Sequence, residues 1–167
     1  MSKATPIKRD RNLVWLSRDH HDGLLMVWKI RQGIRFNVSN TRINNFAASA
    51  FRSELEPHFY EEEDLLFINL PESDALRVKA ESEHAAIREI AAALKPGTES
   101  TDADLEAFAN LLEAHIRFEE RILFPYIEKE ISAEMLDIIG SQLEAEHLTK
   151  KPFVWQDEFW IKGTPNH

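Results

Sequence analysis

The chain has 167 residues, of which 43% are hydrophobic, and this size and composition suit a single compact domain. Its formal net charge of -9 argues against binding to nucleic acid or to anionic membrane surfaces, because both are negatively charged. The absence of cysteine excludes disulfides, iron–sulfur clusters and thiolate zinc sites, so any bound metal must have imidazole and oxygen ligands.

The first segment, MSKATPIKRDRN, is basic but polar and lacks the apolar core of a signal peptide. No run approaches the roughly 20 apolar residues that span a bilayer, so we expect a soluble, cytoplasmic protein. With only 5 Gly and 7 Pro, and long stretches rich in Ala, Leu, Glu, Lys and Arg, the composition favours an all-α fold.

The first predicted helix covers residues 12–35 and carries one apolar stripe at helical spacing. His20 lies in the middle of this stripe, whereas His21 is rotated by about 100° toward the flank of the helix. A histidine that points inward from this helix is therefore His20.

The second predicted helix covers residues 41–70, with His58 and Glu62 on its apolar side. Pro57 interrupts it, and because proline lacks a backbone donor it should bend the helix just before His58.

The third predicted helix follows Pro71 and ends near Leu94, with His84 on its inner stripe. The fourth runs from a cap at Thr101 or Asp102 to about residue 130, with a kink expected at Pro125. Its inner face includes His115 and Glu119.

A fifth helix is predicted from Ser132, with His147 on its apolar side, and an aromatic tail follows it. The short connections favour antiparallel neighbours, so we expect an up-down-up-down four-helix bundle with an additional C-terminal helix. The prediction is one domain over residues 1–167, with the core bundle at about 12–130 and the extra helix and tail at about 131–167.

A ten-residue pattern, H-x-x-x-E-E-x-[LI]-L-F, occurs twice, from His58 and again 57 positions later from His115. A His and a Glu four positions apart stack on one face of a helix, where their atoms can converge on one ion. The second and fourth helices of such a bundle lie diagonally opposite and point the same way. The repeat therefore places two His/Glu pairs at a similar depth in one core.

The two glutamates of this repeat fall inside apolar stripes, where an unpaired ionised group costs several kcal/mol. A single histidine on an apolar face is more often a hydrogen-bonded core residue than a ligand, but here the acids need a positive partner, and no Lys or Arg lies near them on the inner faces. Glu63 and Glu120 turn away by about 100° and are expected in solvent. The expected metal ligands are His20, His58, Glu62, His84, His115 and Glu119.

Mixed imidazole and carboxylate ligands suit iron, manganese or zinc. Two ions fit better than one: bridging glutamates, four histidines and a bridging oxo or hydroxo group fill about ten of the twelve positions of two octahedral ions. About two positions then remain for water, dioxygen or another small ligand. An apolar ring is expected to limit access by water, and it comprises Phe51, Leu65, Leu112, Phe118 and Ile122.

At these residues the sequence resembles the hemerythrin-like, or HHE cation-binding, family, over about residues 13–130. The resemblance rests on Asp19-His20, His58-x-x-x-Glu62, Glu83-His84 and His115-x-x-x-Glu119 followed by ILFP. It implies a four-helix bundle around a non-haem di-iron centre, with glutamates bridging the two iron ions and histidines as terminal ligands. Members bind dioxygen, sense oxygen, iron or redox state, or act in nitric oxide stress and iron–sulfur repair.

The chain departs from the oxygen-carrying hemerythrins, which have a second His four residues after the first on the third helix and an Asp five residues after the His on the fourth. Arg88 occupies the first of these positions, and Glu119, at spacing four, supplies the carboxylate. A reversible oxygen carrier is therefore not expected. His147 is a candidate for the missing imidazole, and packing against the bundle end is the alternative.

We expect a metal-binding or sensor protein whose di-iron site binds a small diatomic ligand, dioxygen or nitric oxide, or reports redox or iron status. One alternative is an enzyme acting on dioxygen, peroxide or nitric oxide, including iron–sulfur repair. Another is a structural or interaction module whose ions, such as zinc, only tie the helices together.

The aromatic tail is expected to fold back over the bundle, with a homodimer or protein-partner surface as the alternative. The tail residues concerned are Phe153, Trp155, Phe159 and Trp160. Tyr126 is expected to pack in the core, and a hydrogen bond or redox role beside the metal is the alternative.

Overall fold

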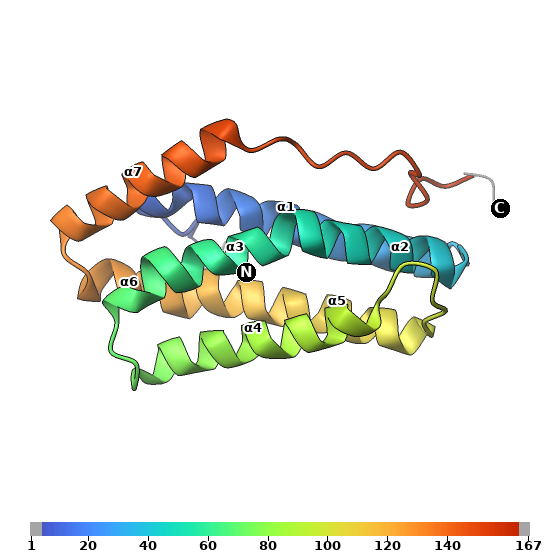
Figure 1. The fold of residues 1–167 in the computed structure, drawn as a ribbon, viewed down its shortest axis with the longest axis horizontal. Coiled ribbons are helices and arrows are strands. Elements are labelled where there is room, and N and C mark those ends of the chain that lie inside the picture. Colours follow the sequence, from blue (N-terminus) through green and yellow to red (C-terminus); the bar gives the residue numbers. More distant parts are fainter. Residues whose placement is uncertain (1–4, 164–167) are drawn as a thin grey trace.

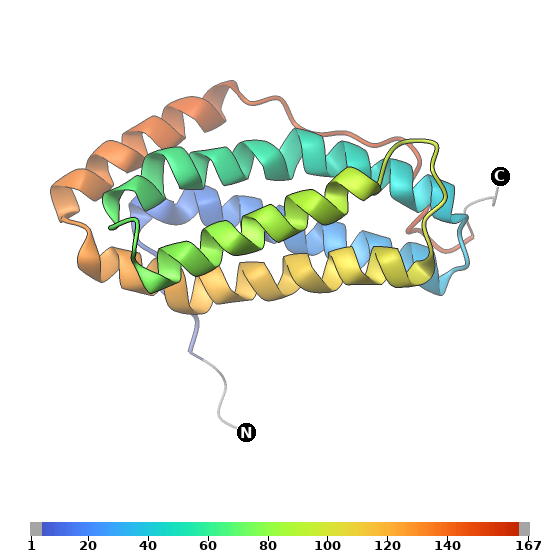
Figure 2. The ribbon, with the colours of Figure 1, turned by 60° about the horizontal axis from the view of Figure 1, so that its bottom comes forward.

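The structure is a computed structural model that describes residues 5–163. Within this range all regular secondary structure is helical, and four long rods run up and down beside one another (Figures 1 and 2). The rods are α1 (Val14–Arg35), α2 (Asn40–Ala50) with α3 (Glu56–Glu61), α4 (Ala75–Ala93), and α5 (Asp102–Phe118) with α6 (Phe124–Glu130). A further helix, α7 (Ala133–Thr149), lies outside the four rods. The predicted all-α bundle with an extra C-terminal helix is confirmed.

Helix α1 packs on α2 and α5, and α4 packs on the same two helices. The α2/α3 rod and the α5/α6 rod therefore occupy opposite corners, as predicted for the second and fourth helices of an up-down-up-down bundle. Two short 3₁₀ turns complete the chain path, η1 (Arg11–Leu13) before α1 and η4 (Phe67–Asn69) at the end of the second rod.

Side-chain caps fix where several helices begin. Asp74 accepts hydrogen bonds from two backbone N–H groups in the first turn of α4. Thr101, one of the two predicted caps, starts α5 through a reciprocal capping box with Asp104. Ser132 caps α7. These caps satisfy backbone donors that a helix start leaves unpaired.

Both prolines within the long rods follow a widened, π-helical turn. The turn η2 (Phe51–Leu55) ends just before α3, whose first turn contains Pro57. The turn η5 (Glu119–Leu123) ends just before α6, whose first turn contains Pro125. A bend before His58 and a kink at Pro125 are the expectations from the sequence. Because proline cannot donate to the preceding turn, the structure has a π-helical turn before each proline.

A third π-helical turn, η3 (Glu62–Leu66), has no proline next to it. Glu62 and Glu119 each open a π-helical turn, in which a residue's partner lies five positions away instead of four. The inward direction therefore shifts by one residue: Leu123 is fully buried, whereas Ile122 is 52% exposed. The predicted place of Ile122 in the inner apolar ring is wrong for this reason.

The apolar core consists of two clusters, which lie on either side of a polar level along every rod. On α1, for example, Leu16 belongs to one cluster and Met26 to the other, with His20 between them. On α4, Ala80 and Ile87 flank His84 in the same way. The predicted ligands thus occupy one cross-section of the bundle, closed by hydrophobic packing above and below.

Helix α7 packs on η1 and α1, and the segment after it runs back along the bundle (Figure 1). Phe159 is fully buried, and its ring centroid lies 5.4 Å from that of Phe46. The Phe46 ring is also in contact with the other three tail aromatics, Phe153, Trp155 and Trp160. The predicted folding of the aromatic tail over the bundle is confirmed, and its use as a partner surface stays a prediction.

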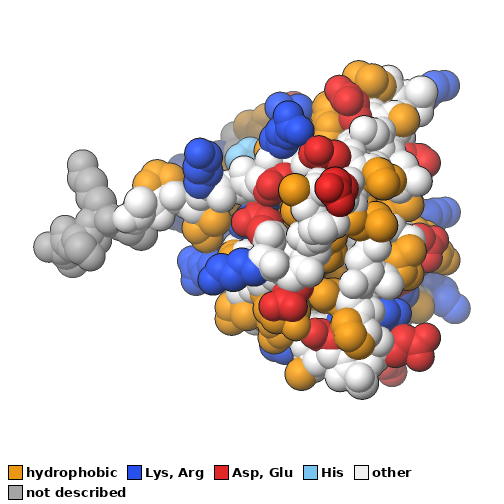
Figure 3. Space-filling model, turned by 90° about the vertical axis from the view of Figure 1, so that its left-hand side faces the viewer, with side chains coloured by type: hydrophobic (Ala, Val, Ile, Leu, Met, Phe, Trp, Pro, Cys, Tyr) orange, Lys and Arg blue, Asp and Glu red, His pale blue; other side chains and the backbone are white. Residues whose placement is uncertain are grey.

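Acidic, basic and hydrophobic side chains are interspersed on the end of the bundle drawn in Figure 3. Two apolar side chains of α7 are exposed, Ile138 at 54% and Leu148 at 72%. None of the described helices combines the length and apolar character that crossing a bilayer requires.

Candidate metal centre

All six predicted ligands come together at the polar level between the two apolar clusters. Each is between 0 and 3% exposed. The α1, α4 and α5 helices supply one histidine each and α3 the fourth, while the two glutamates open the π-helical turns η3 and η5. The six residues are His20, His58, Glu62, His84, His115 and Glu119.

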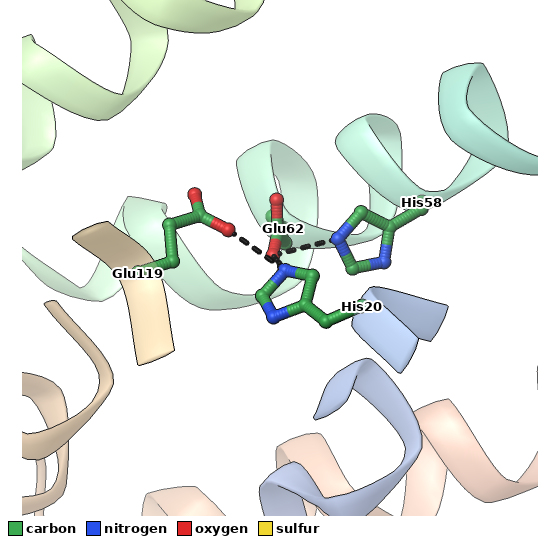
Figure 4. A group of neighbouring side chains, drawn as sticks. All are labelled: His20, His58, Glu62 and Glu119. Carbon is green, nitrogen blue, oxygen red and sulfur yellow. Dashed lines mark ion pairs between the residues drawn. The ribbon is translucent and has the colours of Figure 1, made fainter. Parts of the chain in front are cut away.

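One half of the centre contains the histidines of α1 and α3 (Figure 4). Glu62 Oε1 lies 2.9 Å from His58 Nε2 and 3.4 Å from His20 Nε2. Glu119 Oε2 lies 2.9 Å from His20 Nε2. Two nitrogens and two carboxylate oxygens therefore converge here from three of the rods.

The other half contains the histidines of α4 and α5. Glu62 Oε2 lies 3.1 Å from His84 Nε2, and Glu119 Oε1 lies 3.2 Å from His115 Nε2. Each glutamate thus gives one oxygen to each half. This is the arrangement that two carboxylates bridging a pair of ions require.

The eight inward atoms of the centre are buried and make no hydrogen bond within the described part of the chain. They are both oxygens of Glu62 and Glu119 and the Nε2 atoms of the four histidines. A buried polar atom left without a partner costs about 1–3 kcal/mol, and eight in one place need an explanation. Nitrogen and oxygen donors that converge without bonding one another fit a metal site.

The electrostatics of the centre keep both carboxylates ionised. Burial and the nearby Glu119 carboxylate raise the pKa of Glu62, but His58 and His20 outweigh them and lower it to about 2. Burial lowers the pKa of His58, but the Glu62 and Asp19 carboxylates raise it to about 9. The buried anions therefore need cations beside them, and metal ions compete for this place with protons on the imidazoles.

The outward Nδ1 atom of every histidine faces a second carboxylate. The pairs are His20 with Glu120 (2.7 Å), His58 with Asp19 (3.0 Å), His84 with Glu63 (2.7 Å) and His115 with Glu83 (3.6 Å). The first three distances are hydrogen bonds, and the fourth is a longer contact. An Nδ1–H that donates to a carboxylate leaves the Nε2 lone pair pointing into the centre, as a metal ligand requires.

The expectation that Glu63 and Glu120 lie in solvent is wrong. Their side chains are only 21% and 25% exposed. A rotation of about 100° from an inward residue carries a side chain toward the adjacent helix of the bundle rather than into water. The sequence signal for this outer shell was the acidic residue directly beside a predicted ligand, as in Asp19-His20 and Glu83-His84.

Each outer carboxylate has a basic neighbour of its own. The contacts are Arg9 with Glu120 (3.0 Å), Lys150 with Asp19 (3.9 Å), Arg88 with Glu63 (2.8 Å) and Lys79 with Glu83 (3.0 Å). Arg88, which stands where oxygen-carrying hemerythrins have a histidine, also contacts Glu56. Arg88 thus pairs with the same carboxylate that accepts a hydrogen bond from His84.

His147 lies outside both halves of the centre. Its Nε2 is 3.0 Å from Glu61 Oε2 and 3.5 Å from Asp19 Oδ2, and its ring stacks on Trp15. Hydrogen bonding to Glu61 raises the pKa of this histidine. The structure connects His147 to the centre only indirectly, through Asp19 and His58.

Tyr126 is also remote from the centre, because its hydroxyl donates to Asp74 at the start of α4. Aromatic rings cover the histidines instead. Phe59 stacks on His84 with centroids 3.9 Å apart, and Phe124 stacks on His20 at 5.2 Å. These two phenylalanine rings shield the histidines from water, whereas Ile122, which was expected to contribute to this shielding, is exposed.

A helical bundle whose core holds a buried His/Glu cluster suited to metal binding is the class of protein that this fold and site define. The family model described as Hemerythrin HHE cation binding domain matches residues 17–127, and the chain belongs to this family. No curated protein and no solved structure matches the chain.

Proposed function

We propose that the chain is a hemerythrin-like di-iron protein that binds or senses a small ligand, such as dioxygen or nitric oxide, or reports redox or iron status. The observation that carries this proposal is the division of each buried glutamate between two histidine pairs. Family membership and the cysteine-free ligand set support iron, and manganese and zinc are the alternatives.

One ion would be held by His20 and His58, the other by His84 and His115, and both by the glutamates. Each ion would then have four protein ligands, which leaves about two of six octahedral positions for a bridging oxygen and a small ligand. Bound iron supplies redox and Lewis-acid chemistry at such positions. The protein's own contribution is to fix the ligands and to exclude bulk water.

The burial of the centre favours a small ligand. The six side chains are at most 3% exposed, and stacked phenylalanines cover two of the histidines. A dioxygen or nitric oxide molecule can diffuse through brief openings of such packing, whereas a larger substrate needs a permanent entrance.

The test is anaerobic purification with metal analysis, followed by absorption spectra upon addition of dioxygen or nitric oxide. The proposal predicts about two iron ions per chain and a charge-transfer band that changes with the added gas. Zinc in place of iron, a large loss of stability on chelation and no spectral response would instead identify a metal-stabilised structural module.

An enzyme is the second candidate, and one observation favours it. His58, Asp19 and His147 form a polar chain from the centre to a surface cleft, and turnover needs such a route for protons. Catalytic consumption of peroxide or nitric oxide with an added reductant would support the enzyme. Stoichiometric, reversible binding without turnover would support the sensor.

A further inference from the structure

A cleft of ≈ 430 Å³ lies between α1, the second rod and the segment that follows α7. None of the six candidate metal ligands lines it. Its volume falls within the range of about 300–1,000 Å³ that is usual for small-molecule sites. The C-terminal segment thus forms one wall of the cleft, and Asp19, which hydrogen-bonds His58, lies in another.

Aromatic and aliphatic side chains form much of the lining. Trp15 and Phe46 come from the bundle, and Phe153 comes from the C-terminal segment. Phe46 is 2% exposed, so the accessible apolar surface comes from Trp15 and Phe153 together with Leu25, which is 42% exposed, and the exposed Pro152. Such walls favour a ligand with a flat apolar body, because aromatic rings pack well face to face or edge to face.

The charges around the cleft differ in sign from those of the whole chain. Four basic residues and three acidic residues line it, which gives +1, against -9 for the protein. The basic residues are Arg18, Lys29, Lys150 and Lys151, and the acidic ones are Asp19, Asp22 and Glu54.

Two of these acids already have partners, since Asp19 contacts His58 and Glu54 contacts Lys150 at 3.2 Å. Among the described residues, three of the basic side chains, Arg18, Lys29 and Lys151, form no ion pair, and of the acids only Asp22 is likewise without one. The Arg18 guanidinium lies over the Trp15 ring, 4.7 Å from its centroid, so an uncompensated cation stands directly beside an aromatic wall.

We propose that this cleft binds a small organic anion that carries an aromatic ring, of the aromatic carboxylate or sulfonate class. The ring packs among Trp15, Leu25 and Phe153, and the acidic group faces Arg18 and Lys151. The proposal stands independently of the metal assignment, because no metal ligand lines the cleft.

The test uses anilinonaphthalene sulfonate as a fluorescent aromatic anion, titrated into the full chain as purified. Phenylnaphthylamine, which has the same rings without the sulfonate, is the matched ligand control. The proposal predicts saturable binding of the sulfonate at one site and at least tenfold weaker binding of the uncharged dye, the effect of about one charge-assisted contact.

The double variant Arg18→Gln/Lys151→Gln should weaken sulfonate binding at least tenfold. The matched variant Arg121→Gln/Lys129→Gln removes the same charge from exposed positions outside the cleft and should bind like the parent chain. Circular dichroism and metal content, measured on the same samples, separate loss of binding from loss of fold or of metal.

Equal affinity for the two dyes would overturn the proposal, as would a double variant that binds like its matched control. A chain that holds no metal but still binds the sulfonate selectively would contradict the proposed metal function and leave the cleft proposal supported. The two ideas can therefore fail separately.

Discussion

Three consecutive residues, Glu62, Glu63 and Asp64, provide a graded test of the metal centre. Glu62 is fully buried with one oxygen in each half of the centre, whereas Glu63 accepts hydrogen bonds from His84 and Arg88. Asp64 is exposed. Alanine substitutions at these positions remove in turn a carboxylate inside the candidate metal centre, one that contacts a histidine of the centre, and one in solvent.

If the centre holds two ions as proposed, Glu62→Ala should lose both, because it removes a ligand that they share. Glu63→Ala removes the group that orients His84, and the loss of such a partner typically weakens metal binding about 10–100-fold, or about 1.4–2.8 kcal/mol. In the proposed two-ion centre, that loss should fall on the ion assigned to His84 and His115. Asp64→Ala should bind metal like the parent chain.

The assay is competition with a chelator of known affinity under anaerobic conditions, combined with metal analysis of each variant. Two binding steps of unequal affinity are expected for Glu63→Ala. If Glu62→Ala and Glu63→Ala lose metal equally, or if Asp64→Ala matches either, the assigned helix phase is wrong.

Other parts of the structure yield three further predictions. His147→Gln should keep the metal content of the parent chain while His84→Gln loses metal, and elemental analysis that finds equal losses would place His147 among the ligands. Phe59→Ala should lower the free energy of unfolding by about 3–5 kcal/mol in urea, because it empties a buried aromatic position; a cost below about 1 kcal/mol would contradict the packing described. Gly33→Ala should lower the melting temperature, since an added Cβ would lie 2.7 Å from the Phe159 ring; an unchanged melting temperature would show that the tail does not press on α1.

The sequence predicted the helices, their order and the six central residues, because each signal is local to one helix. Spacing of four residues puts His58 and Glu62 on one face whatever the neighbouring helices do. The helix cap at Thr101 and the irregular helical turn before Pro57 likewise depend on a few adjacent residues.

Three residues were placed wrongly from the sequence, Ile122, Glu63 and Glu120, because helical periodicity alone shows neither a local change of helix type nor the contacts between helices. Ile122 was placed inside by a constant α-helical period, but the π-helical turn at Glu119 changes that period locally. Glu63 and Glu120 were assigned to solvent because a single helix does not reveal what its flank meets. Their partners are histidines on other rods, which only the packed bundle specifies.

The carboxylates behind the histidines close a ring around the bundle. Asp19 of α1 hydrogen-bonds His58 of the second rod, and Glu63 of the second rod hydrogen-bonds His84 of α4. Glu83 of α4 faces His115 of α5, and Glu120 of the fourth rod hydrogen-bonds His20 of α1. No rod can slide lengthwise without pulling on its neighbour's imidazole, so the four should open as one cooperative unit in hydrogen exchange. The longest link of this ring, 3.6 Å between Glu83 Oε1 and His115 Nδ1, joins α4 to α5.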